Sequence, residues 1–141
     1  MSISSLALRT TTFTATSTAN IEWRTPATVR AKVLEVSYIQ LTAIASQIGL
    51  GRPQAVGATP VNVLFQSDDP GDPASVMNGS LSWATSPTVP LIYHRRWNGT
   101  LASVGVVWTF PRGLVIPISF SLVIWNIATT VASDCNCILD E

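Results

Sequence analysis

His94, the only histidine of the chain, is followed by Arg95, Arg96 and Trp97. A histidine that acts as a general base needs an orienting partner and a nucleophile, and no such residues occur at a recognisable spacing from His94. Arginine and tryptophan are among the residue types that most often anchor protein interfaces. We therefore interpret residues 94–97 as a contact patch. The alternative is a pair of solvated arginines beside an ordinary buried tryptophan.

Three aspartates, Asp68, Asp69 and Asp72, lie in a segment that superficially resembles a calcium-binding loop. Two prolines interrupt the spacing of the carboxylates, and no bidentate glutamate follows at the twelfth position. We predict a solvated acidic turn in this segment, with no metal site and no cofactor.

Cys135 and Cys137 are the only cysteines of the chain. In a strand, residues two apart share a face with their Cα atoms about 6.6 Å apart, a separation that would strain a disulfide. Two thiols without histidines do not make a zinc site either. We predict free, half-buried thiols in a reducing compartment. Because the chain also lacks a glycine-rich phosphate loop and a nucleophile elbow, we expect no enzyme and no catalytic residues.

The composition points to a protein that is covered by neighbours. Eight Lys and Arg balance eight Asp and Glu, so no net charge draws the chain to nucleic acid or to an anionic membrane. Only 11% of the 141 residues are charged and 47% are hydrophobic, whereas about 25% of an average globular chain is charged. Such a surface is typical of an assembly subunit. A surface rich in Thr and Ser is the alternative.

No membrane segment and no leader are predicted. The longest apolar run, residues 114–128, is interrupted by Pro117 and falls short of the roughly 20 residues that span a bilayer. The first residues are rich in Thr and lack the basic and apolar regions of a standard signal peptide.

Residues 102–127 hold the densest apolar sequence and are expected to form the centre of the fold. Their first part alternates as a strand with one face in a core. Pro111-Arg112-Gly113 then predicts a turn. Residues 119–127 are apolar on both faces, which places this strand in the middle of a sandwich or in an interface. The residues expected in the core are Trp108, Phe110, Leu122 and Ile124.

The remaining segments predict strands that surround this centre. The alternation in residues 28–40 changes parity at Val33-Leu34, which predicts a β-bulge. Residues 41–50 fit either a helix or a strand with a loop. Turns are predicted at Asn78-Gly79 and Asn98-Gly99, a strand through Leu91 and Tyr93, and a final strand at residues 131–140.

These segments predict an all-β chain that folds as an antiparallel β-sandwich of the jelly-roll type. Seven or eight short strands with near-regular turn signals support this class. Residues 1–20, rich in Thr and poor in core anchors, are expected to form an extended N-terminal arm or an edge strand. Residues 21–141 are expected to form a single sandwich domain.

Several packing and turn motifs lie between Val29 and the end of the chain. They are Leu34-Glu35-Val36, Gly49-Leu50-Gly51-Arg52-Pro53, Trp83 before Pro87-Thr88-Val89-Pro90, Tyr93 with Arg95-Arg96, the run from Val107 to Leu114, Leu122-Val123-Ile124-Trp125-Asn126, and Asp140-Glu141. With these motifs the chain resembles small virion proteins of tailed bacteriophages, a group associated with jelly-roll folds. The resemblance implies a structural part of a phage particle, present in the host cytoplasm before assembly.

Two functions follow from this resemblance. The first is a capsid decoration or cement protein, a homo-oligomer expected as a trimer, that binds the major capsid protein or another virion protein, and neither nucleic acid nor a membrane. The second is a receptor- or carbohydrate-binding sandwich on a tail or fibre, because exposed tryptophans stack on sugars. The two differ in whether Trp83 and Trp97 are buried or form an exposed aromatic platform.

Overall fold

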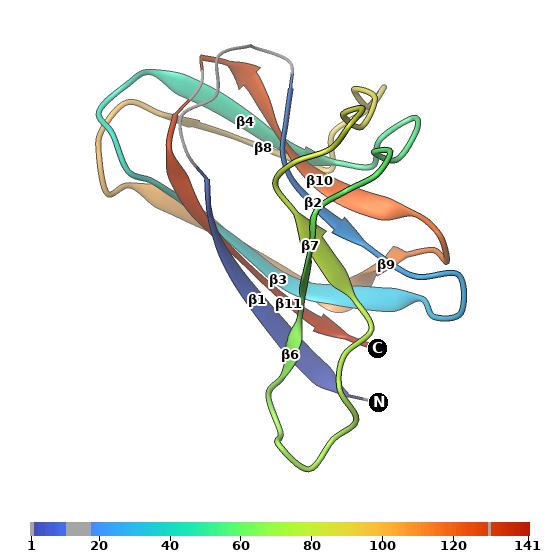
Figure 1. Ribbon diagram of the computed structural model, residues 1–141. Coiled ribbons are helices and arrows are strands. Elements are labelled where there is room, and N and C mark those ends of the chain that lie inside the picture. The colour runs from blue at the N-terminus through green and yellow to red at the C-terminus, as the bar shows by residue number, and fades with distance from the viewer. Residues whose placement is uncertain (1, 11–17, 130) are drawn as a thin grey trace.

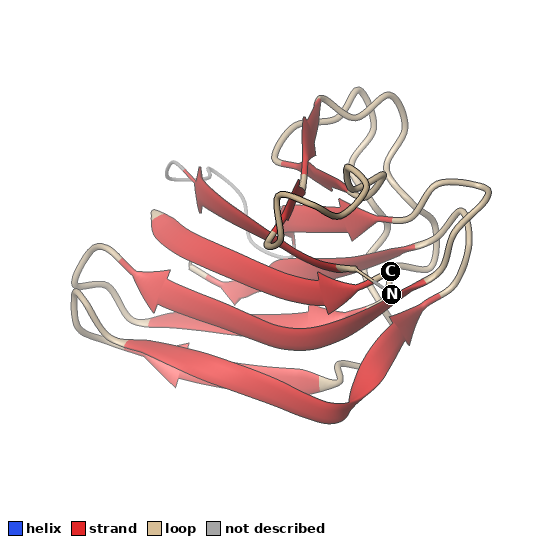
Figure 2. Cartoon of the chain, turned by 90° about the horizontal axis from the view of Figure 1, so that it is seen from below, coloured by secondary structure: helices blue, strands red, loops and turns tan. Residues whose placement is uncertain are grey.

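The computed structural model of the protein describes residues 2–10, 18–129 and 131–141, and within these ranges the chain forms eleven strands and no helix. The strands are β1 (Ile3–Thr10), β2 (Thr18–Arg24), β3 (Ala31–Gln40), β4 (Ser46–Gly51), β5 (Asn62–Leu64), β6 (Gln66–Ser67), β7 (Asn78–Ser80), β8 (Arg95–Gly99), β9 (Gly105–Ile116), β10 (Ser121–Ala128) and β11 (Ser133–Asp140). They form two antiparallel layers (Figures 1 and 2). Sheet A has the order β6-β1-β11-β3-β9, and sheet B has the order β5-β7-β2-β10-β4-β8. The predicted all-β sandwich is confirmed.

The strand pairing follows one nested pattern. β1 pairs with β11, β2 with β10, β3 with β9 and β4 with β8, all antiparallel. Successive members of this set alternate between the sheets, so the chain forms one long ribbon that wraps around the core. This is the eight-stranded jelly-roll arrangement. The segment between β4 and β8 is an insertion that supplies the short strands β5, β6 and β7.

The core lies between the inner faces of the two sheets. Strand side chains alternate between faces, and the inward positions of the long strands are almost fully buried. Of the predicted core residues, Trp108, Leu122 and Ile124 are buried, and Phe110 is partly buried against the same cluster.

The predicted bulge in β3 is present at Leu34. Along β11, Ile138 faces Glu35 and the next residue faces Val33, so Leu34 is passed over in the register. Because of this extra residue, Val33 and Val36 both point into the core although their numbers differ in parity.

The predicted turn at Pro111–Gly113 is wrong. β9 continues through these residues, with Thr109 facing Glu35 and Leu114 facing Val33. Residues 110–113 therefore form a bulge on β9 opposite the bulge on β3. Gly113 has φ of 71°, a conformation that glycine adopts without strain. Pro111 and Gly113 thus mark a bulge instead of a turn. Pairing with β3 on both sides of the bulge keeps the direction of the chain unchanged.

Two other local predictions are also wrong. The Asn78-Gly79 and Asn98-Gly99 pairs lie inside β7 and β8 rather than in turns. In each case the glycine leaves room for a neighbouring side chain. A Cβ on Gly79 would lie 2.4 Å from Leu6, and one on Gly99 would lie 2.0 Å from the Trp97 ring.

The segment around Leu91 and Tyr93 is a loop instead of the predicted strand. Leu91 is 84% exposed, and regular pairing begins only at Arg95. In the ambiguous segment 41–50, the strand alternative holds, because β4 begins at Ser46 and pairs with both β10 and β8.

The N-terminal residues are integrated into the sandwich where the structure describes them. Ile3–Thr10, expected as an arm or an edge strand, pair along their full length with β11, and β6 lies on the other side of β1 at Ser4 and Ser5. The boundary expected at residue 20 falls inside β2. Residues 11–17, also assigned to the arm, lie outside the described residues.

β10 is buried on both faces, as predicted. Leu122 and Ile124 point into the main core, whereas Val123 and Trp125 form a second cluster on the outer face of sheet B with Trp83, Val89 and Tyr93. The side chains that cover this outer face come from the insertion between β4 and β8. Sheet B is therefore packed on two sides.

A fully buried carboxylate, that of Glu22, fixes this cover in place. Glu22 Oε2 accepts a 2.6 Å hydrogen bond from the Trp83 indole nitrogen, and Oε1 accepts one of 2.6 Å from Ser121 Oγ. The backbone nitrogen of Gly57 donates to Oε1 over 3.2 Å. A buried charge is tolerated only when it is hydrogen-bonded in this way.

Glu22→Gln should destabilise the fold by about 1–3 kcal/mol, because an amide NH2 would face donors that now bind the carboxylate. Urea unfolding and tryptophan fluorescence measure the loss, and Trp83 emission should change with it. Glu35→Gln, a substitution on the partly exposed outer face of sheet A, is the matched control. Equal midpoints for the two variants would contradict the structural role of Glu22.

Trp108→Ala should cost about 3–5 kcal/mol, because a large buried ring is replaced by a cavity. Its neighbour Val107 is 59% exposed, so Val107→Ala serves as the control and should change stability little. Thermal unfolding gives the comparison. A melting temperature for Trp108→Ala equal to that of the wild type would place the ring outside the core.

Candidate functional site

The predicted contact patch lies on β8, which is the last strand of sheet B. Alternation along the strand sends Arg95 and Trp97 toward the gap between the sheets and Arg96 toward the outer face. Trp97 packs on Tyr38, with ring centroids 5.6 Å apart. Trp97 is half-buried, and Arg95 and Arg96 are exposed. The four predicted residues therefore divide into a packing residue and two surface cations, and His94 joins the patch to the preceding loop.

Each arginine of the patch covers an aromatic ring. The Arg95 guanidinium lies 5.2 Å from the centroid of Phe110 on β9, and that of Arg96 lies 5.3 Å from the centroid of Tyr93. These distances are typical of cation–π contacts. The rings hold the guanidinium groups in position at the surface, which lowers the entropic cost of using them in an interface.

A shallow groove of about 360 Å³ adjoins Arg95 at the edge of the sandwich. It is lined by Arg95, Thr109, Phe110, Pro111, Arg112 and Gly113. Residues 111–113 were predicted as a turn and Phe110 as a core residue, so their part in this surface was missed. The only sequence signal for this surface was the presence of Phe110 and Arg112 beside Pro111 and Gly113.

The patch is positively charged and has no acidic partner. Among residues 2–10, 18–129 and 131–141, the ion pair that the structure contains joins Arg9 and Asp134, away from the patch. Arg52 lies close enough to raise the local potential, and it donates a hydrogen bond to the carbonyl of Val115. Burial, and then the positive charges of Arg52 and Arg95, lower the pKa of His94. His94 is therefore neutral at pH 7, and the positive charge comes from the arginines.

The reactive side chains do not assemble into a catalytic centre in the part of the chain that the structure describes. Cys135 and Cys137 are free and fully buried, deeper than predicted. Burial raises the pKa of Cys135 to about 12 and also raises the pKa of Cys137. Neither thiol is therefore ionised near neutral pH, and a thiol is a weak nucleophile.

The acidic segment forms a hydrogen-bonded turn. Asp69 Oδ1 accepts from the backbone nitrogen of Gly71 over 2.8 Å, and the Asp69 carbonyl accepts from the backbone of Asp72. The described residues contain no group of three or more His, Cys, Asp and Glu side chains placed to hold a metal ion.

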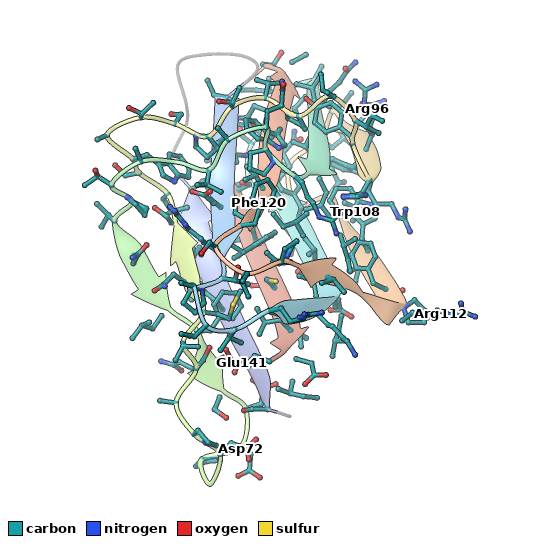
Figure 3. All side chains as sticks on the ribbon, turned by 90° about the vertical axis from the view of Figure 1, so that its right-hand side faces the viewer. Asp72, Arg96, Trp108, Arg112, Phe120 and Glu141 are labelled. Atoms are coloured by element: carbon teal, nitrogen blue, oxygen red, sulfur yellow. The ribbon has the colours of Figure 1, made fainter. Side chains whose placement is uncertain are left out.

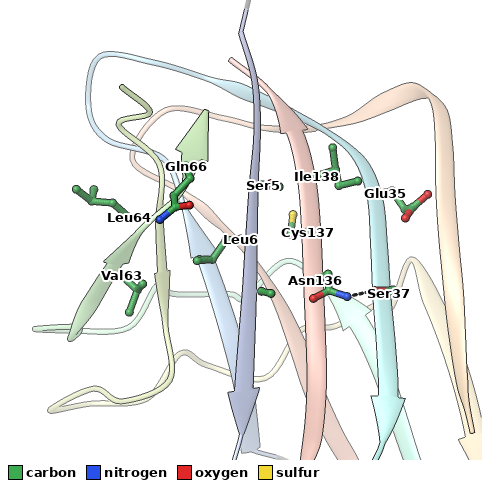
Figure 4. A pocket seen from close by; sticks show the side chains of 11 residues that line it. Ser5, Leu6, Glu35, Ser37, Val63, Leu64, Gln66, Asn136, Cys137 and Ile138 are labelled. Atoms are coloured by element: carbon green, nitrogen blue, oxygen red, sulfur yellow. Dashed lines mark hydrogen bonds between the residues drawn. The ribbon is translucent and has the colours of Figure 1, made fainter. Parts of the chain in front are cut away.

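A hollow of about 640 Å³ lies on the outer face of sheet A (Figure 4). Ser5, Asn136 and Ser37 contribute to its floor, where Asn136 Nδ2 donates to Ser37 Oγ over 2.8 Å. Val63 and Leu64 of β5 form part of its wall. Glu35 is the only carboxylate in the lining. The hollow offers contact area, and it has no nucleophile–base pair.

The two tryptophans that distinguish the expected functions are both half-buried. Trp83 donates its indole N–H to Glu22, and Trp97 packs against the core. Their rings are therefore engaged within the protein and do not form an exposed platform.

Comparisons with protein-family models, with curated proteins and with solved structures find no match to this chain. In the described residues, no helix is present that is long and apolar enough to cross a membrane. The functional argument therefore depends on the surfaces described above.

His94→Asn should reduce the pH dependence of stability in the mildly acid range. The folded-state pKa lies below the ordinary value of 6.5, so the unfolded state binds more protons and the wild type loses stability as the pH falls below that value. Urea unfolding at about pH 7.5 and about pH 5.5 measures the slope. Because the chain has one histidine, identical slopes for the two proteins would contradict the lowered pKa.

Proposed function

We propose that this protein is a structural protein of a bacteriophage particle, and more specifically a capsid decoration or cement protein that stabilises the head shell as a homo-oligomer. The observation that carries the proposal is a jelly roll with uncovered surfaces in a chain of which only 11% of the residues are charged. Sheet B is covered on both faces by its own chain, whereas the outer face of sheet A and the β8–β9 edge are open. Such surfaces suit a subunit whose neighbours complete its burial.

Exposed apolar side chains support the assembly role. Those with more than half of their surface exposed are Val61, Leu64, Leu91, Ile92, Leu101, Val107 and Ile118. They lie in the insertion, on β9 and in the loops that flank it. With 11% charged residues in the whole chain, few charges are available to keep this surface solvated.

The jelly-roll fold occurs in viral capsid proteins and also in lectins, so the fold supports both expected functions. The engaged rings of Trp83 and Trp97 favour the assembly role over the alternative, a tail- or fibre-associated protein that binds a receptor or carbohydrate. Three copies around a local three-fold axis of a shell remain the proposed oligomer. The proposed partner of that oligomer is the major capsid protein or another virion protein.

The purified protein should form an oligomer in light scattering, should rebind phage particles from which it has been removed, and should raise the temperature at which those particles rupture. The double variant Arg95→Ala/Arg96→Ala should weaken particle binding by about tenfold or more while its melting temperature stays unchanged. Arg30→Ala removes an exposed arginine outside the patch and is the control.

A wild-type protein that remains monomeric and neither rebinds particles nor raises their rupture temperature would contradict the cement role. Binding of the same protein to a glycan array would then favour the receptor-binding alternative.

A further inference from the structure

Sheet A ends in two strands that have free edges in the described part of the chain. At one end, β9 pairs only with β3. At the other end, β6 covers β1 only at Ser4 and Ser5, so residues 6–10 pair with β11 alone. Unpaired backbone groups on such edges are templates for a strand of another chain.

The β9 edge has two different halves. Residues 110–113 hold a proline, an arginine and the bulge, which are features that block strand addition. Residues 105–109 carry no charge, no proline and no bulge, and Val107 is 59% exposed. The first half of β9 is therefore an unprotected edge about five residues long.

The free edges match in direction and in level. The order β1-β11-β3-β9 is antiparallel throughout, so β9 runs opposite to β1. A second copy placed beside β9 by translation across the strands would present its β1 antiparallel to β9. The register joins Ala7, Asn136, Ser37 and Val107 in one row across the sheet. The centre of the free part of β9 thus lies level with the free part of β1.

The charges beside these edges are complementary at corresponding levels. On β9, Arg112 lies in the bulge between Thr109 and Leu114, whose rows across the sheet lead to Ser5 and Ser4 on β1. At the β1 edge, Asp68 Oδ1 accepts a 2.6 Å hydrogen bond from Ser5 Oγ, and the loop continues through Asp69 and Asp72. Arg112 and Asp72, at the tip of this acidic loop, lie far apart on the molecule, at the right-hand margin and at the bottom of the view (Figure 3).

We propose that copies of this chain associate head to tail, with residues 105–109 of one copy pairing with residues 6–10 of the next and Arg112 lying beside the Asp68 loop. The inference deepens the proposed function and rests on its premise that the protein self-associates. The two surfaces are residues 105–109 and residues 6–10, and the arrangement is head to tail. A contact between unlike surfaces closes into a ring or extends as a filament, whereas a two-fold dimer joins like surfaces. A two-fold contact of β9 with β9 would instead bring the Arg95 and Arg112 groups of both copies together.

Single-cysteine variants distinguish these arrangements. Arg112→Cys and Asp68→Cys are each treated with a short bifunctional maleimide, alone and as an equal mixture. Cross-linked dimers are expected only in the mixture. The wild type controls for Cys135 and Cys137, which are buried. Dimers of Arg112→Cys alone would overturn the proposal in favour of a two-fold contact, and no cross-linking in the mixture would overturn it outright.

Charge reversal provides the second measurement. Arg112→Asp and Asp68→Arg should each raise the self-association constant Kd by about tenfold or more, and the double variant should recover most of the loss. Arg30→Asp, outside both edges, controls for net charge. Failure of the double variant to recover association would overturn the pairing of Arg112 with Asp68.

These results separate the contact from the proposed function. A wild type that cross-links head to tail but does not rebind phage particles retains the contact and loses the cement role. A wild type that rebinds particles but gives no mixed cross-link retains the cement role and loses the contact.

Discussion

The Glu22 carboxylate is the interaction on which the cover over the outer face of sheet B depends. It has no exposed surface, and its oxygens accept hydrogen bonds from β10, from the Trp83 indole and from the backbone at Gly57. It thereby joins the insertion between β4 and β8 to the outer face of sheet B. With that cover in place, Val123 and Trp125 are buried as fully as the inward residues of the same strand. A carboxylate without these donors would carry a large desolvation cost, so the cover and the charge stabilise each other.

The insertion covers sheet B and leaves sheet A uncovered. The surfaces that stabilise the fold are therefore separate from those that are open to contact with other molecules. Sheet B packs against the main core on one side and against its own insertion on the other. Sheet A has the core on its inner side only. Its outer face carries the hollow of about 640 Å³, and its β1 and β9 strands have free edges. Because the two sets of surfaces barely overlap, the proposed contacts between copies can be lost without unfolding the subunit. That separation suits a protein that is folded before it joins an assembly.

Sequence patterns predicted the features that depend on side-chain burial and missed those that depend on pairing partners. The parity change at Val33-Leu34 identified a true bulge, because both halves of β3 must face one core. The apolar faces of residues 119–127 identified a doubly buried strand for the same reason. In contrast, Pro111–Gly113 carries ordinary turn residues, yet the neighbouring β3 holds both flanks of the bulge in one line. The Asn-Gly pairs also carry ordinary turn residues. They lie in paired strands, where their glycines make room for the Leu6 and Trp97 side chains.

The sequence by itself determined the all-β class, the sandwich, the core positions of Trp108, Leu122 and Ile124, and a low content of charged residues. Alternation and composition are local properties, and burial imposes them on every strand. Only the tertiary structure decided how residues 94–97 divide between packing and surface, and that Phe110 and Arg112 join Arg95. It also decided that Asp68 and Arg112 lie at the two edges of one sheet. These relations arise from the nested pairing of strands far apart in the chain, such as β1 with β11 and β3 with β9. Such long-range pairing is set by how the whole ribbon wraps around its core, and no short pattern of residues encodes it.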